Sequence, residues 1–158
     1  MVILLETCCF FGHKTIFNKE NLYERLKIEV ENLIKVGFSS FLVGTHGEFD
    51  KIALSVCKEL KVKHNHINIC VVLTSLNKLI KKDGFSDVDF YKDRNIETLY
   101  YPIENIHFKQ KIIFSNHCMI DDSDIVVCYV NMSKQQSGAK QAIKYAQKKN
   151  KEIINLFV

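Results

Sequence analysis

Three short segments of the chain combine glycine with polar side chains that could bind an anion. Their sequences are FGHKT at residues 11–15, GTHGEFD at residues 44–50 and NMSKQQSG at residues 131–138. Each segment follows an apolar run and leads toward a stretch with helical periodicity. Glycine lets a ligand approach the backbone closely, and the N–H groups and dipole of a helix start attract negative charge. We therefore expect the segments together to hold a phosphate-bearing ligand, although none contains G-x-G-x-x-G or a Walker motif.

The residues expected to contact that ligand come from these segments and from two positions elsewhere. They are Gly12, His13, Lys14, Gly44, Thr45, His46, Gly47, Glu48, Asp50, Tyr101, Asn116, Ser137 and Gly138. The two histidines titrate near neutrality, so they could orient a phosphate or exchange a proton, or could instead bond to loop backbone. Tyr101 could stack on a base or pack in the core, and Asn116 could bind the ligand or anchor a loop.

Two of these residues are carboxylates at the expected start of a helix. Glu48 or Asp50 would be the catalytic base if the protein were an enzyme, and Asp50 could also hold a ribose hydroxyl. Carboxylates are equally favoured in a first helical turn, where they cap backbone amides and interact with the helix dipole. The sequence leaves both roles open.

Other clusters of polar side chains are interpreted as structural. His64 and His66 precede a strand and should lie at the opposite end of the sheet from His13 and His46, so no metal site is expected. Three aspartates lie between a helix and a strand on that same side and are interpreted as turn formers: Asp121, Asp122 and Asp124.

The elements that must position these residues alternate along the chain. Apolar, β-branched runs predict strands at residues 2–10, 40–43, 67–73, 97–100, 124–130 and 152–157. Apolar spacings of three and four predict helices at residues 19–36, 49–60, 106–120 and 138–149, and residues 81–94 are expected to form a surface loop. Such alternation predicts an α/β fold, namely a three-layer, Rossmann-like, doubly wound and mostly parallel sheet of five to six strands. Ligands bind such sheets beyond the carboxyl ends of the strands, where the strand order reverses.

The composition is that of one globular domain covering residues 1–158. Hydrophobic residues make up 47% and charged residues 25% of the chain, with a single proline, which excludes disordered and fibrous classes. The formal net charge of +4 is smaller than expected for a dedicated DNA-binding protein. Residues 134–152 alone carry +5, from six lysines and one glutamate. Lys140, Lys144 and Lys148 are spaced by four in this segment and are interpreted as a solvated helix stripe.

Cysteine usage and hydropathy predict the cellular compartment. Six cysteines without a C-x-x-C pair lie mostly in apolar runs, as expected for reduced thiols in the cytoplasm. Cys8 and Cys9 are expected to pack in the core, since nothing nearby would activate a thiolate. The first residues lack the basic region of a signal peptide, and no apolar stretch reaches the roughly 18–20 residues of a membrane span. We expect a cytoplasmic protein without membrane contact.

The order of these motifs resembles that of the YpsA-like branch of the SLOG superfamily, which also includes the Smf/DprA and LOG proteins. The resemblance spans nearly the whole chain and rests on FGHK at residues 11–14, GTHGEFDKIA at 44–53, NHCMIDDSD at 116–124, SGA at 137–139 and YA at 145–146. It implies a Rossmann-like fold and a nucleotide or nucleotide-derived ligand in the crevice. For this branch it implies no established reaction.

The chain departs from the pattern of these relatives at three places. Lys14 stands where they commonly have arginine. In the segment at residues 115–119, Ser115 and Cys118 stand where they commonly have arginine and tryptophan, so a guanidinium clamp and an aromatic platform are missing. The segment SGAKQ at residues 137–141 lacks the glycine pair and the glutamate of the LOG motif. Phosphoribohydrolase activity of the LOG type is therefore not expected.

Three functions remain open from the sequence. The leading hypothesis is a protein that binds or senses a nucleotide or nucleotide derivative, held by the loops after the first, second and fifth strands, with no other cofactor. The second is a hydrolase or transferase acting on an N-glycosidic or phosphoester bond of a nucleotide. The third is a protein or nucleic-acid adaptor that has lost ligand binding, although nucleic acid is the less expected partner. The oligomeric state, including a homo-oligomer, is left open.

Overall fold

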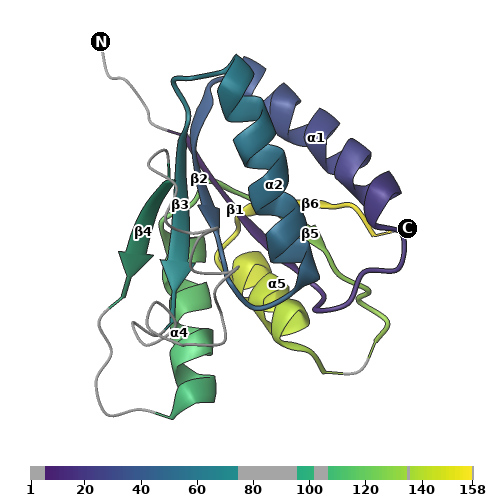
Figure 1. Cartoon of the computed structure of the whole chain (residues 1–158). Coiled ribbons are helices and arrows are strands. Elements are labelled where there is room, and N and C mark those ends of the chain that lie inside the picture. The colour runs from purple at the N-terminus through teal and green to yellow at the C-terminus, as the bar shows by residue number, and fades with distance from the viewer. Residues whose placement is uncertain (1–5, 75–95, 102–106, 135, 158) are drawn as a thin grey trace, which may run out of the picture.

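The computed structural model describes residues 6–74, 96–101, 107–134 and 136–157. Six strands form one parallel sheet in the order β4-β3-β2-β1-β5-β6, as Figure 1 shows. The strands are β1 (Glu6–Gly12), β2 (Phe38–Val43), β3 (Asn68–Leu73), β4 (Ile96–Tyr100), β5 (Ile125–Tyr129) and β6 (Glu152–Asn155). The helices of the described part are α1 (Lys19–Lys35), α2 (Glu48–Lys63), α4 (Phe108–Asp121) and α5 (Gly138–Lys148). The predicted α/β, Rossmann-like fold is confirmed.

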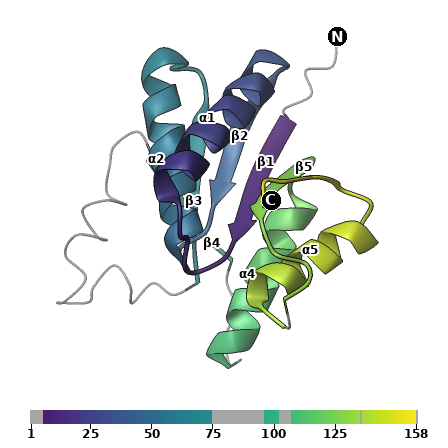
Figure 2. The same cartoon turned by 90° about the vertical axis from the view of Figure 1, so that its right-hand side faces the viewer.

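Two pairs of helices cover the two faces of the sheet. Helices α1 and α2 lie on one face and α4 and α5 on the other, as the turned view in Figure 2 shows. Strand β1 contributes to both cores, because Cys8 and Phe10 pack toward α1 and α2 whereas Cys9 and Phe11 pack toward α4 and α5. A central strand buried on both faces explains why the segment is a continuous apolar run, and it confirms that Cys8 and Cys9 are core residues.

The strand order reverses beside β1. The chain first builds β1, β2, β3 and β4 outward in one direction, and after α4 it returns to place β5 on the free side of β1. Strands β1 and β5 pair in register from Cys8 opposite Ile125 to Gly12 opposite Tyr129. The loops that leave these two strands therefore diverge at the carboxyl edge of the sheet, where ligands bind in this architecture.

The boundaries of most elements lie close to the predicted ones. Helix α4 begins at Phe108, two residues later than predicted, and projects beyond the carboxyl ends of the strands (Figure 1). The predicted loop at residues 81–94 and the first residues of the predicted first strand lie outside the described residues. Within the described part of the chain, no helix is both long and apolar enough to cross a membrane.

Candidate ligand-binding site

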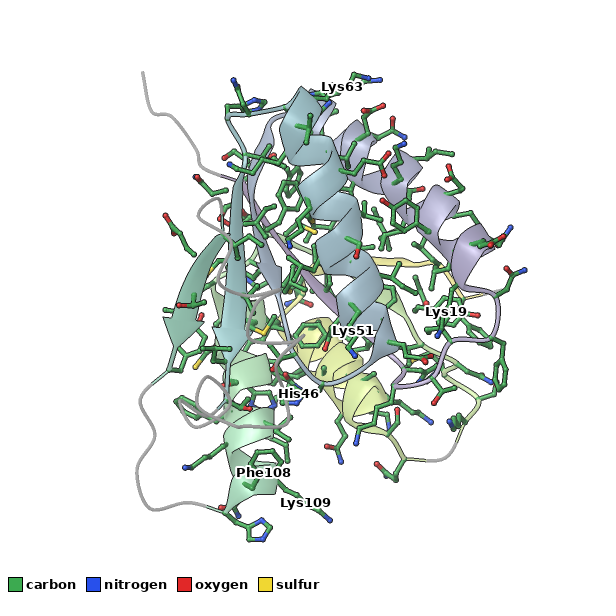
Figure 3. The ribbon with its side chains drawn as sticks, viewed as in Figure 1. Lys19, His46, Lys51, Lys63, Phe108 and Lys109 are labelled. Carbon is green, nitrogen blue, oxygen red and sulfur yellow. The ribbon has the colours of Figure 1, made fainter. Side chains whose placement is uncertain are left out.

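A cavity of about 980 Å³ opens at the carboxyl edge of the sheet. It is bordered by the loops after β1, β2 and β5, by α4 from Phe108 to Asn116, by the start of α5 and by the segment after β6. Figure 3 labels His46, Phe108 and Lys109 at this end of the molecule, toward which the strand arrows point. Nine of the residues predicted to contact a ligand line it: Gly12, His13, Lys14, Gly44, His46, Asp50, Asn116, Ser137 and Gly138. Tertiary structure thus brings together residues that are up to 126 positions apart in the sequence.

Gly12 has a packing role that the sequence did not reveal. A Cβ at this position would lie 2.3 Å from Cγ of Phe49, whose side chain is fully buried. Ordinary carbon–carbon contacts are about 3.5–4.0 Å, so only glycine lets the first turn of α2 sit this close to the end of β1. The prediction that Gly12 serves the ligand omitted this helix–strand contact.

The loop after β1 is docked on the start of α2. The Glu48 N–H donates to the Lys14 carbonyl at 2.9 Å, and the Glu48 carboxylate accepts from the Ile16 N–H at 2.6 Å. That carboxylate also forms an ion pair with Lys19 at 2.9 Å. Gly47 permits this approach, because a Cβ there would lie 2.6 Å from Cα of Lys14.

These contacts give Glu48 a structural role. The Ile16 N–H and the Lys19 ammonium lower the pKa of Glu48 below its usual value of 4.5, which suits a fixed anion and not a proton acceptor at neutral pH. Glu48 does not line the cavity, and its side chain instead supports the loop after β1. The geometry therefore favours a structural role over the catalytic one, and this role is to hold the loop after β1, since α2 has no side-chain cap hydrogen bond.

Asp50 is the one carboxylate among the described residues that line the cavity. Its Oδ2 accepts a hydrogen bond from the His46 N–H at 2.7 Å, so the side chain folds back over the loop after β2. A Cβ at Gly44 would lie 3.2 Å from the same oxygen, which makes glycine the residue that fits beneath the carboxylate. Asp50 thus combines loop support with access to the cavity.

His13 joins the two loops that flank the point of strand reversal. Its backbone N–H donates to the Tyr129 carbonyl at 3.3 Å, and its Nε2 accepts from the Asn131 N–H at 2.8 Å. The rings of Tyr129 and Phe157 lie edge-on to the imidazole, each with a centroid distance of 6.3 Å. Burial, followed by the charge of Lys134, lowers the pKa of His13 below its usual value of 6.5. The imidazole is therefore neutral at physiological pH.

The loop after β5 ends in a capped helix start that faces the cavity. Ser137 Oγ accepts from the Lys140 N–H at 3.1 Å, which is the N-cap arrangement. The Lys140 ammonium donates to the Lys134 carbonyl at 2.8 Å and so ties the helix to its own entry loop. Gly138 and Ala139, the first residues of α5, both line the cavity. The positive end of a helix dipole therefore points at this space.

The apolar wall of the cavity was not predicted from the sequence. It is formed by Phe108, Ile112 and Ile113 of α4, by Phe17 after β1 and by Phe157 after β6. Phe108 is 50% exposed and Phe17 is 97% exposed, so these side chains lie at the rim. The sequence does show an apolar spacing of four between residues 108 and 112. This spacing predicts a helix, but it does not predict that the apolar face of the helix borders a cavity.

Two further lysines extend the set of cations that the sequence suggested. Lys109 on α4 and Lys134 in the loop after β5 line the cavity together with Lys14. Set against the one carboxylate of Asp50, the three lysines give the described lining a net positive charge. Such a cavity favours an anionic ligand.

Four of the predicted contacts do not line the cavity. Thr45, Gly47 and Glu48 lie in the loop after β2 and at the start of α2, behind the residues that do. The Tyr101 hydroxyl donates to Asp122 at 2.7 Å, and its ring packs against the core beneath α4 and α5. Burial and the Asp122 carboxylate raise the pKa of Tyr101. Its contact is with the end of α4, which matches the core alternative for this tyrosine.

Two of the residues interpreted as structural, His64 and Asp124, lie at the amino-terminal ends of strands. His64 caps the end of α2 and lies 3.3 Å from Glu31, and Asp124 accepts from the Thr7 N–H at 2.9 Å at the start of β1. In the described ranges, no group of three or more histidine, cysteine or acidic side chains is arranged to hold a metal ion.

Comparison with protein-family models and with curated proteins gave no match to this chain. The fold is Rossmann-like. That description follows from six parallel strands in the order 4-3-2-1-5-6 alternating with helices, and it carries no evidence of family or ligand. A function must therefore be argued from the cavity itself.

Proposed function

We propose that the protein binds a nucleotide or nucleotide derivative in the cavity at the carboxyl edge of the sheet. The observation that carries this proposal is that one cavity at the point of strand reversal is lined both by groups that suit phosphate and by apolar side chains. Lys14, Lys134 and the start of α5 supply the first set, and Phe108, Ile112 and Ile113 on α4 supply most of the second. A nucleotide combines the same two chemistries, with charged phosphates at one end and a flat, largely apolar base at the other.

The phosphate end would lie against α5. The residues Gly138 and Ala139 open the helix and line the cavity, so their backbone amides offer the donors that phosphate prefers at a helix start. Lys14 and Lys134 lie on the two neighbouring loops and would add charge from both sides. This arrangement partly replaces the arginine clamp that the sequence lacks, since an ammonium supplies charge without the bidentate geometry.

The base would lie against the exposed apolar wall. Phe108, Ile112 and Ile113 lie on α4 outside the two core clusters, and the exposed Phe17 lies on the loop after β1. Asp50 lies among the lining residues at a place where its carboxylate could accept a ribose hydroxyl. A volume of about 980 Å³ lies at the upper end of the range for small-molecule sites, so a dinucleotide-sized ligand would fit.

Thermal unfolding in the presence of ligands tests the proposal. The panel is AMP, ADP, ATP, ADP-ribose and NAD, with adenosine as the uncharged member. A bound ligand at 100 times its dissociation constant adds about 2.7 kcal/mol of stability, which is roughly a 5–10 °C rise in Tm for a chain of this size. No rise with any phosphate-bearing compound, for a chain with native circular dichroism, would contradict the proposal.

A pair of lysine variants locates the binding. Lys134→Gln removes a cation that lines the cavity, whereas Lys144→Gln removes an exposed cation on α5 that does not. We expect Lys134→Gln to weaken phosphate binding about fivefold and Lys144→Gln to leave it unchanged, because screened charge effects fall off within about 10 Å. Equal effects of the two substitutions would place binding on the lysine stripe and support the adaptor hypothesis.

A hydrolase or transferase acting on the same ligand is favoured by one observation, the position of Asp50. It is the carboxylate that the described cavity lining offers to a reacting bond. Product release from the panel that stops in Asp50→Asn, while binding is kept, would establish this activity. Binding without turnover would leave a binding or sensing protein.

A further inference from the structure

His13 occupies the point where the loops after β1 and β5 separate. Its Nε2 lies 2.8 Å from the Asn131 backbone nitrogen and accepts that N–H. A ring nitrogen that accepts a hydrogen bond must carry a lone pair, so the imidazole is neutral and its proton is on Nδ1. The bond spans 118 positions of sequence and closes the gap between the two loops.

The bond holds more than one residue of the loop after β5. Asn131 organises the following turn, because its side chain accepts from the Ser133 N–H at 3.0 Å and its carbonyl accepts from the Lys134 N–H at 3.1 Å. Lys134 in turn is tied through its carbonyl to Lys140 on α5. The position of Asn131 is therefore transmitted to Lys134 and to the helix start, which are the groups placed at the phosphate end.

The surroundings of His13 disfavour its cation. The Tyr129 ring at the end of β5 and the Phe157 ring after β6 lie edge-on to the partly buried imidazole, and the charge of Lys134 acts on it from the loop after β5. Burial is the larger cause, and the charge of Lys134 the second, of a pKa that lies below the usual value of 6.5. The ionisable groups that line the cavity with His13 are Lys14, His46, Asp50, Lys109, Tyr129 and Lys134.

We propose that neutral His13 is a positioning residue that holds the loop after β5 against the loop after β1, so that acidification loosens the cavity and weakens ligand binding. A proton on Nε2 would set one N–H against another and remove the bond to Asn131. The direct attraction between an imidazolium and an anion would act in the opposite direction. Since Nε2 is engaged by the Asn131 amide, a ligand gains that attraction only after the loops have separated.

This inference deepens the proposed function, but its first test needs no ligand. In the ¹⁵N-labelled full chain, imidazole nitrogen–proton correlation spectra recorded from about pH 5 to pH 8 report the tautomer and the midpoint of each histidine. The His13→Gln variant assigns the His13 signals. We expect the Nδ1–H tautomer at neutral pH, a midpoint below 6.5, and an Asn131 amide that titrates with the same midpoint. A different tautomer, or an Asn131 amide that ignores the His13 titration, would overturn the proposal.

The second test measures affinity with inorganic sulfate, whose charge is constant between about pH 5 and 8. The wild type should lose up to about tenfold in affinity per unit of pH below the His13 midpoint, because binding then requires the neutral form. His13→Ala should bind weakly at every pH, and His13→Gln should recover most of the affinity and lose the pH dependence, since its Oε1 accepts but does not titrate. Equal pH dependence in His13→Gln, or tighter sulfate binding by the wild type on acidification, would refute the inference. Absence of sulfate binding at neutral pH would instead count against the proposed phosphate site, and the ligand-free spectra would still decide whether His13 holds the loop.

Discussion

Replacing Gly12 with alanine tests whether this glycine serves packing or ligand approach. In the structure the new Cβ would lie 2.3, 2.5 and 2.6 Å from three atoms of Phe49. An ordinary contact is about 3.5 Å, so the ring must retreat by about 1 Å from the end of β1. Phe49 is fully buried and stacks on Tyr129 with a centroid distance of 6.4 Å, so this movement also displaces an aromatic ring that lines the cavity.

The magnitude follows from the cost of overpacking a core. Added methyl groups in well-packed cores destabilise proteins by about 1–3 kcal/mol, and the rigid neighbours of Phe49 place this substitution at the upper end. For a chain of 158 residues, about 3 kcal/mol corresponds to a fall in Tm of roughly 6–12 °C. Urea and thermal unfolding of the ligand-free chain measure both quantities.

Two controls isolate the contact with Phe49. Gly138→Ala adds the same methyl group at a position where the new Cβ would meet nothing within 4 Å beyond its chain neighbours and its own helix backbone, and it should be neutral or slightly stabilising at the start of α5. In a Phe49→Leu background, Gly12→Ala should be less destabilising by at least about 1 kcal/mol, because the smaller side chain leaves room. Similar Tm values for Gly12→Ala and Gly138→Ala would refute the packing role and would favour a role of Gly12 in ligand approach.

Three further substitutions test the supports of the cavity. Ser137→Ala removes the N-cap of α5 and should lower the free energy of unfolding by about 0.5–2 kcal/mol in urea titrations, with Ser137→Asp restoring it. Asn155→Ala removes the two hydrogen bonds, of 3.1 and 2.9 Å, that the Asn155 side chain makes with the backbone of buried Val130. We expect the free energy of unfolding to fall by about 1–3 kcal/mol per unsatisfied group and hydrogen exchange in the loop after β5 to become faster. An unchanged exchange rate would show that the loop is held elsewhere. The pKa of Glu48 is lowered, so its contribution to stability is present above about pH 4.5 and is lost as the pH falls below that value. Glu48→Gln should therefore flatten the acid side of the profile of Tm against pH. The control Glu24→Gln, at an exposed site of α1, should not change that profile.

The sequence determined the architecture to within a few residues at most boundaries. Apolar β-branched runs such as residues 67–73 and the unbroken helical spacing from Phe49 to Leu60 depend only on neighbours along the chain, so they are visible without a structure. Strand–helix alternation then implies parallel strands, and parallel strands place all their following loops at one edge. For that reason three glycine-bearing segments could be assigned to one site before their contacts were known.

What each residue does within that site was decided by tertiary structure alone. Gly12, Gly47 and Glu48 have the types expected of a ligand-binding loop, yet the first two allow close packing against Phe49 and Lys14, and the third braces the loop after β1. The apolar wall on α4 and the bond between His13 and Asn131 join residues that are distant in sequence. Local patterns specify which face of a helix is apolar and where a strand ends. They do not specify which partners the remaining side chains meet, because those partners are chosen by the strand order, and that order arises only when the whole sheet assembles.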